Sequence, residues 1–210
     1  MIRVLVADDH AVVRRGVAQI LAAESDILVV AEAGEYSEIR RRLADAPCDV
    51  LVLDIQLPGK NGLEIARSLK EELPKLATLI LSSYPEDQYA VRALRAGAQG
   101  YLAKSAAPDR IVEAVRTVAG GRKYISAEVA LALAESVSGE KTDRPHETLS
   151  DREFQVMRFI ATRKGLAEIA EHLALSPKTV SVYRARVLDK MQLATNAELT
   201  HYALKNGLME

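Results

Sequence analysis

Three aspartates stand at the ends of two apolar runs. Asp8 and Asp9 close the run IRVLVA, and Asp54 closes the run CDVLVL. If both runs are strands of one parallel sheet, their carboxyl ends meet at one edge and bring the three carboxylates together. Such a group can hold a divalent cation with hard oxygen ligands and can expose one carboxylate oxygen as a nucleophile toward a phosphoryl group.

Two further polar residues follow later apolar runs. Lys104 offers a flexible positive charge to a new phosphoryl group, and the Ser82 hydroxyl can hydrogen-bond one of its oxygens. The loop IQLPGKNG after Asp54 contains a proline and two glycines that allow tight turns, and the backbone carbonyl of Gln56 in this loop is a candidate further metal ligand. Any single aspartate at a strand end is more often a turn or capping residue, so the hypothesis depends on the joint spacing.

The elements that must position these residues follow an alternating pattern. Short, continuously apolar runs are typical of parallel strands covered on both faces, and they alternate with helical patterns. The first half therefore predicts an α/β fold, a five-stranded parallel sheet with helices on both faces. The expected strands cover residues 2–7, 27–33, 49–53, 78–81 and 100–102, and the expected helices cover 11–23, 36–46, 62–73, 86–96 and 108–119.

The motifs ADDH, LDIQLPGKNGLE, LILSS and AGAQGYLAKS, in this order, resemble the receiver domain of two-component response regulators over residues 1–120. The resemblance implies a flavodoxin-like domain that accepts a phosphoryl group from a sensor histidine kinase. It implies a phosphoacceptor with slow self-dephosphorylation, not an enzyme that turns over a substrate. The implied roles are phosphoacceptor for Asp54, Mg²⁺ binding for Asp8, Asp9, Asp54 and the Gln56 carbonyl, and phosphate sensing for Ser82, Tyr101 and Lys104.

In that family the residue at Tyr101 is an aromatic switch that turns inward as the serine hydroxyl moves toward the phosphate. Ser105 departs from the pattern, because the family commonly has proline after the lysine, often preceded by a cis bond. This departure keeps the lysine but leaves the local backbone geometry open.

The second half contains no strand pattern. Residues 121–147 are predicted to form a linker with a short helix at 127–136 and a polar tether, SGEKTDRPHET. Residues 148–210 are predicted to form a small all-α domain with helices at 150–162, 166–173, 176–191 and 195–205. Ser150 and Glu153 have the spacing of a capping box, and Ser176 followed by Pro177 marks the start of the third helix.

The third of these helices has one apolar and one basic face. It carries four basic residues against one acidic residue, and small side chains between them would allow close approach to the major groove of DNA. A solvated helix can show the same excess. The stretches LSDREFQVMRFIA, EIAEHLALSPKTVSVYRARVLDKM and LATNAELTHYAL, however, resemble the LuxR-type helix-turn-helix of the NarL/FixJ subfamily. The resemblance implies DNA contacts from Lys178, Thr179, Ser181, Val182, Tyr183, Arg184 and Arg186.

The subfamily also implies a homodimer on paired half-sites of double-stranded promoter DNA, with the last helix pairing two copies. Its members usually have glycine where Arg163 stands and a serine or threonine cap where Gly165 stands. We expect a shifted turn there and an intact fold, because glycine is acceptable at an N-cap.

Composition sets limits on the class of protein. With 28 basic and 29 acidic residues, overall charge does not indicate a nucleic-acid partner, and any such surface must be local. The lone Cys48 cannot form an internal disulfide, no apolar stretch is long enough to cross a membrane, and a signal peptide pattern is missing at the start, so a cytoplasmic location is expected. His10 is interpreted as a cap of the first helix or as a residue at the edge of the site, in preference to a metal ligand.

Two alternatives remain open from the residues. An aspartate-nucleophile phosphatase also places an acidic site on a parallel sheet, but it normally has a second carboxylate two residues after the nucleophile, where this chain has Gln56. The other alternative is a regulator that binds DNA constitutively with a site that is no longer phosphorylated. The complete acidic set, with Ser82 and Lys104, argues against that second alternative.

Overall fold

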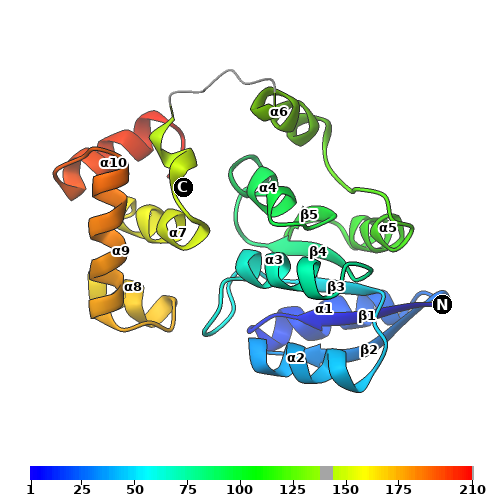
Figure 1. The fold of residues 1–210 in the computed structure, drawn as a ribbon. Coiled ribbons are helices and arrows are strands. Elements are labelled where there is room, and N and C mark those ends of the chain that lie inside the picture. The colour runs from blue at the N-terminus through cyan, green and yellow to red at the C-terminus, as the bar shows by residue number, and fades with distance from the viewer. Residues whose placement is uncertain (138–143, 210) are drawn as a thin grey trace. The chain divides into compact units, whose positions relative to one another are not determined.

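The computed structural model describes residues 1–137 and 144–209, so the centre of the predicted tether lies outside the described residues. The chain divides into two compact units, residues 1–138 and residues 139–210; Figure 1 shows their elements. No helix in the described ranges combines the length and apolar character that crossing a bilayer requires.

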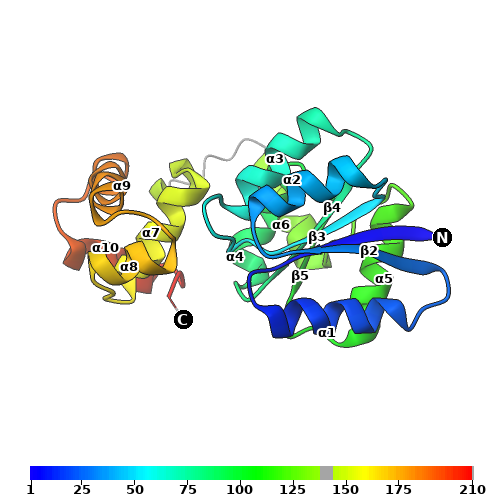
Figure 2. The same cartoon turned by 90° about the horizontal axis from the view of Figure 1, so that it is seen from below.

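The first unit contains a parallel sheet of β1 (Ile2–Ala7), β2 (Ile27–Ala33), β3 (Val50–Leu53), β4 (Ala77–Ser82) and β5 (Gly100–Ala103). The helices are α1 (Ala11–Ala22), α2 (Tyr36–Asp45), α3 (Gly62–Glu72), α4 (Glu86–Arg95) and α5 (Pro108–Ala119). The strand order is β2-β1-β3-β4-β5, and Figure 2 shows α1 and α5 on one face of the sheet and α2 and α3 on the other. The predicted flavodoxin-like fold is confirmed, and its strand order reverses between β1 and β3, where such sheets bind ligands.

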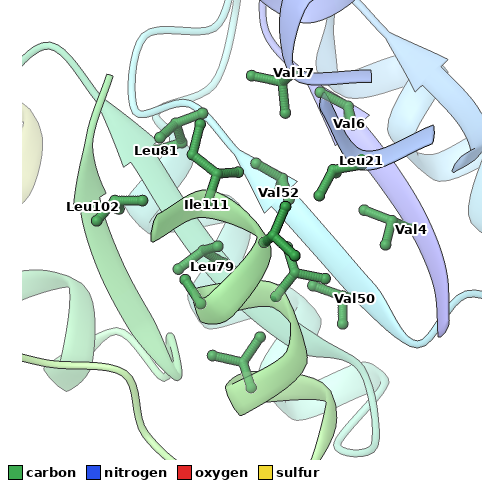
Figure 3. Packing of buried hydrophobic residues seen from close by; sticks show 14 of the residues in the cluster. Val4, Val6, Val17, Leu21, Val50, Val52, Leu79, Leu81, Leu102 and Ile111 are labelled. Atoms are coloured by element: carbon green, nitrogen blue, oxygen red, sulfur yellow. The ribbon is translucent and has the colours of Figure 1, made fainter. Parts of the chain in front are cut away.

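The core lies between the sheet and the helices that cover it. Every residue of β3 is buried, as the unbroken apolar run predicts for a strand covered on both faces. On one face Val52 and Leu79 pack with Leu21 of α1 and Ile111 of α5, all at most 3% exposed (Figure 3). Burying a side chain of this size contributes about 1.5–3 kcal/mol, so the central strands that carry the acidic residues are firmly held.

The chain after α5 continues to pack on the first unit. Tyr124 forms a parallel bridge with Gly100: the Tyr124 N–H donates to the Gln99 carbonyl at 2.9 Å, and the Tyr124 carbonyl accepts from the Tyr101 N–H at 3.4 Å. The following helix α6 (Ala127–Val137) packs on α4 and buries Val129. A residue of the predicted linker therefore pairs with the outer edge of β5 at its start, and the limits of that linker at 121 and 147 stay a prediction.

The second unit consists of the 3₁₀ turn η1 (Pro145–Thr148) and the helices α7 (Asp151–Ala161), α8 (Leu166–His172), α9 (Pro177–Lys190) and α10 (Asn196–Lys205). Helix α7 contacts α8, α9 and α10. The predicted all-α fold is confirmed. The capping box is also confirmed: the Ser150 hydroxyl accepts from the Glu153 N–H, and the Glu153 carboxylate accepts from the Ser150 N–H at 2.8 Å.

The helices of the second unit end in left-handed residues. Arg163 follows α7 with φ 63°, Ala174 follows α8 with φ 50°, and Gln192 follows α9 with φ 55°. The Lys164 N–H bonds back to the Phe159 carbonyl, as in a Schellman motif, where glycine is the usual left-handed residue. The departure from the family pattern at Arg163 therefore leaves the fold intact, with an arginine in the strained conformation and Gly165 as the extended N-cap of α8.

Candidate functional site

The strand register brings the first and last of the three aspartates together. Ala7 of β1 is paired with Leu53 of β3, and the Asp54 N–H donates to the Ala7 carbonyl at 2.9 Å. Asp8 and Asp54 thus leave neighbouring strands at the same level, and their side chains are nearly inaccessible, 4% and 2% exposed. Two carboxylates that are buried side by side need a counter-charge.

Lys104 provides that charge. It follows β5, and its Nζ lies 2.8 Å from Asp54 Oδ2 and 2.6 Å from Asp8 Oδ2. Burial raises the pKa of Asp54 to about 6, against the opposing effect of the Lys104 ammonium. Burial lowers the pKa of Lys104, but the two carboxylates outweigh it and leave that pKa above its ordinary value. The ammonium is therefore fixed at the phosphoacceptor candidate before any phosphoryl group arrives.

Asp9 and His10 form the open side of the acidic site. Asp9 is exposed, and His10 Nδ1 lies 2.6 Å from Asp9 Oδ1 and 3.5 Å from Asp8 Oδ1. His10 occupies the N-cap of α1, but its side chain makes no capping hydrogen bond. Of the two roles considered from the sequence, the structure therefore agrees with a residue at the edge of the site.

The donor atoms suit a hard divalent cation. Within the described ranges, donor atoms of Asp8, Asp9, His10 and Asp54 all lie within 4.8 Å of one another. Mg²⁺ is usually held by one or two carboxylates plus waters and phosphate oxygens, so the carboxylates of this set fit it. The Gln56 side chain points elsewhere and donates to the Tyr84 hydroxyl at 2.6 Å.

Ser82 and Tyr101 lie in a buried cluster beside the acidic site. The Ser82 hydroxyl, 1% exposed, accepts from the Tyr84 N–H at 3.2 Å. The Tyr101 hydroxyl donates to the Tyr84 carbonyl at 2.7 Å, the ring is 1% exposed, and burial raises the pKa of the phenol. Tyr101 thus has the inward orientation that the resemblance associates with phosphorylation. The described chain contains no cis peptide bond, so Lys104–Ser105 is trans.

Two residues near the site had not been predicted from the sequence. Tyr84 contacts Gln56 and Tyr101 and stacks on Tyr89, with ring centroids 4.5 Å apart. Arg14 of α1 donates to the Asp8 carbonyl at 2.6 Å and to Glu32 at 3.1 Å. Position relative to a strand end could have indicated Tyr84, which comes two residues after β4. Arg14 had no such signal, because its contact depends on the path of the loop after β1.

The second candidate surface is the outer side of α9. Val180, Val187 and Leu188 are buried against the other helices, as the helical period predicts. Of the seven predicted DNA contacts, three are half-buried, namely Thr179, Tyr183 and Arg184, and four are exposed, namely Lys178, Ser181, Val182 and Arg186.

Polar contacts hold α9 at both ends. The Ser176 hydroxyl caps it by accepting from the Thr179 N–H at 3.1 Å. Lys190 reaches back to Glu153 of the capping box at 2.7 Å, and Arg184 donates to the Asn196 side chain at 2.7 Å. Arg184 therefore joins α9 to α10, whereas Arg186 stands outward.

Comparison with known proteins agrees with both units. Residues 4–116 match the model of the response regulator receiver domain, and residues 147–203 match that of bacterial regulatory proteins of the luxR family. Response regulator UvrY of Escherichia coli K12 is 38% identical over 99% of this chain and 96% of its own length. Response regulator GacA of Pseudomonas aeruginosa is 35% identical over 100% and 99%.

Solved structures extend the agreement to the whole chain. The response regulator ChrA of a heme-sensing two-component system has a TM-score of 0.53 at 33% identity, covering 99% of this chain and 98% of that one. RcsB of Salmonella typhimurium has a TM-score of 0.57 at 25% identity, covering 96% and 97%. The chain therefore belongs to the response regulators that join a receiver domain to a LuxR-type DNA-binding domain.

Proposed function

We propose that Asp54 is the phosphoacceptor of this regulator and that a sensor histidine kinase is its phosphoryl donor. An Asp54 oxygen attacks the phosphorus of the phosphohistidine, and an aspartyl phosphate forms. The phosphorus–nitrogen bond breaks, its electron pair stays on the imidazole, and that nitrogen takes up a proton. The contact that carries the proposal is the one between Lys104 Nζ and Asp54 Oδ2 at 2.8 Å, because it fixes a cation where the phosphoryl oxygens arrive.

Asp8, Asp9 and Asp54, with the backbone carbonyl of Gln56, are the residues that would hold Mg²⁺. When bound, the ion supplies neutralisation of the phosphoryl oxygens during transfer. The chain's own part is to keep Asp8 and Asp54 adjacent through the pairing of β1 with β3. The acceptance is autocatalytic, with slow self-dephosphorylation, and the protein is not an enzyme.

Phosphorylation brings three strong acceptor oxygens and about −1.5 to −2 charges. Lys104 and the Ser82 hydroxyl turn toward these oxygens. Ser82 does so from its place in the cluster with Tyr84 and Tyr101. This biases a two-state surface made of α4 and β5. Helix α6 packs on α4, and Tyr124 pairs with the edge of β5, so the change reaches the segment that leads to the second unit.

The output is control of transcription. Helix α9 enters the major groove of double-stranded promoter DNA, where Lys178 and Arg186 contact phosphates or base edges and Val182 contacts apolar groups. Two copies bind paired half-sites as a homodimer through α10, and phosphorylation promotes this state or releases the DNA-binding unit. We place the protein in the cytoplasm, with its DNA. The similarity to RcsB of Salmonella typhimurium supports this proposal, because that response regulator shows conformational dynamism for DNA interaction.

The rival functions have less support. A phosphatase would need an acid or base two residues after Asp54, and the Gln56 side chain is hydrogen-bonded to Tyr84 instead. A constitutive regulator would not need to keep the buried Asp8 and Asp54 paired with Lys104.

Labelling by acetyl phosphate in Mg²⁺ tests the input. We expect intact-mass analysis to find one added phosphoryl group on the full chain and none on Asp54→Asn. The exposed Asp45 of α2 is the matched control, and Asp45→Asn should label like the wild type. Equal labelling of Asp54→Asn would refute the assignment.

Footprinting of promoter DNA with and without acetyl phosphate tests the output, and protection that labelling leaves unchanged would favour the constitutive alternative.

A further inference from the structure

The Asp8 carboxylate has two differently occupied sides. Its Oδ2 atom faces Lys104 Nζ at 2.6 Å. Its Oδ1 atom accepts from the His10 backbone N–H at 2.8 Å and lies 3.5 Å from His10 Nδ1. The side of the acidic site away from Lys104 is therefore bounded by Asp8, Asp9 and the imidazole of His10.

The spacing of these atoms suits a shared cation. Neighbouring ligands of an octahedral ion with bonds of about 2.1 Å are about 3.0 Å apart. His10 Nδ1 lies 2.6 Å from Asp9 Oδ1 and 3.5 Å from Asp8 Oδ1, on either side of that value. The His10 side chain is 62% exposed, so it can make the remaining adjustment without disturbing the core.

We propose that His10 is a nitrogen ligand of the metal site, so that the site discriminates among divalent cations. The inference rests on the proposed function for the existence of that site. Imidazole binds later first-row cations such as Co²⁺ strongly, whereas Mg²⁺ prefers oxygen ligands and keeps its waters. His10 therefore raises the affinity of the site for Co²⁺ and adds little to its affinity for Mg²⁺. With His10 the receiver binds a transition metal more readily than three carboxylates alone would.

Calorimetric titration of the full-length protein with Co²⁺ and, separately, Mg²⁺ tests the proposal. For His10→Ala we expect about a tenfold loss of Co²⁺ affinity and a change in Mg²⁺ affinity below about threefold. The visible absorption of bound Co²⁺ should also change, because a nitrogen ligand is lost. His201→Ala is the matched control, since His201 is exposed on α10 of the other unit. The acidic site of this variant should bind Co²⁺ with the affinity of the wild type.

Two results would overturn the role of His10. Equal losses for Co²⁺ and Mg²⁺ would make it a residue that merely positions Asp8 and Asp9, and no loss for either cation would leave it outside the site. The same samples are labelled with acetyl phosphate in Mg²⁺. Labelling at Asp54 without a cation-specific effect of His10→Ala would refute this inference alone, whereas failure of the wild type to label would refute the proposed function.

Discussion

The sheet edge of the first unit and the outer face of α9 both carry charged side chains, but the two regions differ in how far these charges are buried and paired. Asp8 and Asp54 are buried and both pair with the half-buried Lys104, whereas Lys178 and Arg186 are exposed on the helix surface. A buried charge affects folding as well as chemistry, and an exposed one affects mainly its ligand. Substitutions at the sheet edge should therefore change stability and function together, and those on α9 should separate them.

The largest effect is expected where the backbone beside Asp54 is most crowded. Gly62 opens α3, and a Cβ there would lie 2.1 Å from the Asp54 carbonyl oxygen and 2.7 Å from Ile55 Cα. Backbone atoms cannot give way easily, so Gly62→Ala should cost about 3 kcal/mol or more of unfolding free energy, measured by urea denaturation. Gly16→Ala is the control, because open space surrounds that position in α1 and the change should stabilise by about 0.5–1 kcal/mol. Equal stabilities for the two variants would contradict the close approach.

The next effect is a gain of stability on loss of the buried charge. The rise of the Asp54 pKa from 3.8 to about 6 corresponds to at most about 3 kcal/mol. The substitution also removes a partner of Lys104, and this loss offsets part of the gain. We therefore expect the unfolding free energy of Asp54→Asn to exceed that of the wild type by about 1–2 kcal/mol at pH 7.5 in metal-free buffer. The folded pKa is raised, so the stability that protonation contributes is complete below pH 3.8 and lost as pH rises through 6.

Denaturation curves of wild type and Asp54→Asn across about pH 4 to 7.5 measure this linkage. Their difference in unfolding free energy should be smallest at the acid end of this range and largest above pH 6. A difference that grows toward acid pH would show that burial is not the largest influence on the pKa of Asp54. The contrast between the sheet edge and α9 would then be weaker.

The sequence predicted the parts of the site that depend on strand order. Apolar runs that end in Asp8 and Asp54 define two strands, and a parallel sheet places their ends side by side, as the structure has them. The contacts of Arg14 and Tyr84 were missed, because they depend on loop conformations that no periodic pattern encodes. The docking of α6 on α4 was missed for a related reason: a helical pattern shows that a helix has an apolar face but not which surface receives it.

A smaller effect is expected at the turn between α7 and α8, where Arg163 is exposed. Arg163 holds φ 63°, a conformation that costs a residue with a side chain about 1–2 kcal/mol and glycine little. Arg163→Gly should therefore raise the unfolding free energy by about 0.5–1 kcal/mol after the added entropy of the unfolded chain is counted. Arg163→Ala is the control, because it removes the same side chain and keeps the strain. A similar gain in Arg163→Ala would assign the effect to the lost charge.

The smallest effect on stability, and the sharpest separation of binding from folding, is expected at Arg186. Its side chain is exposed on α9, so Arg186→Ala should change the unfolding free energy by less than about 0.5 kcal/mol. If the guanidinium contacts a DNA phosphate, affinity should fall for all sequences, and the slope of log K against log salt should become shallower by about 1. Arg122→Ala removes the same charge from an exposed position of the first unit and should leave that slope unchanged. An unchanged slope for Arg186→Ala would contradict a phosphate contact. A loss of stability comparable to that of a buried residue would mean that a charge on α9 contributes to folding, as the charges at the sheet edge do.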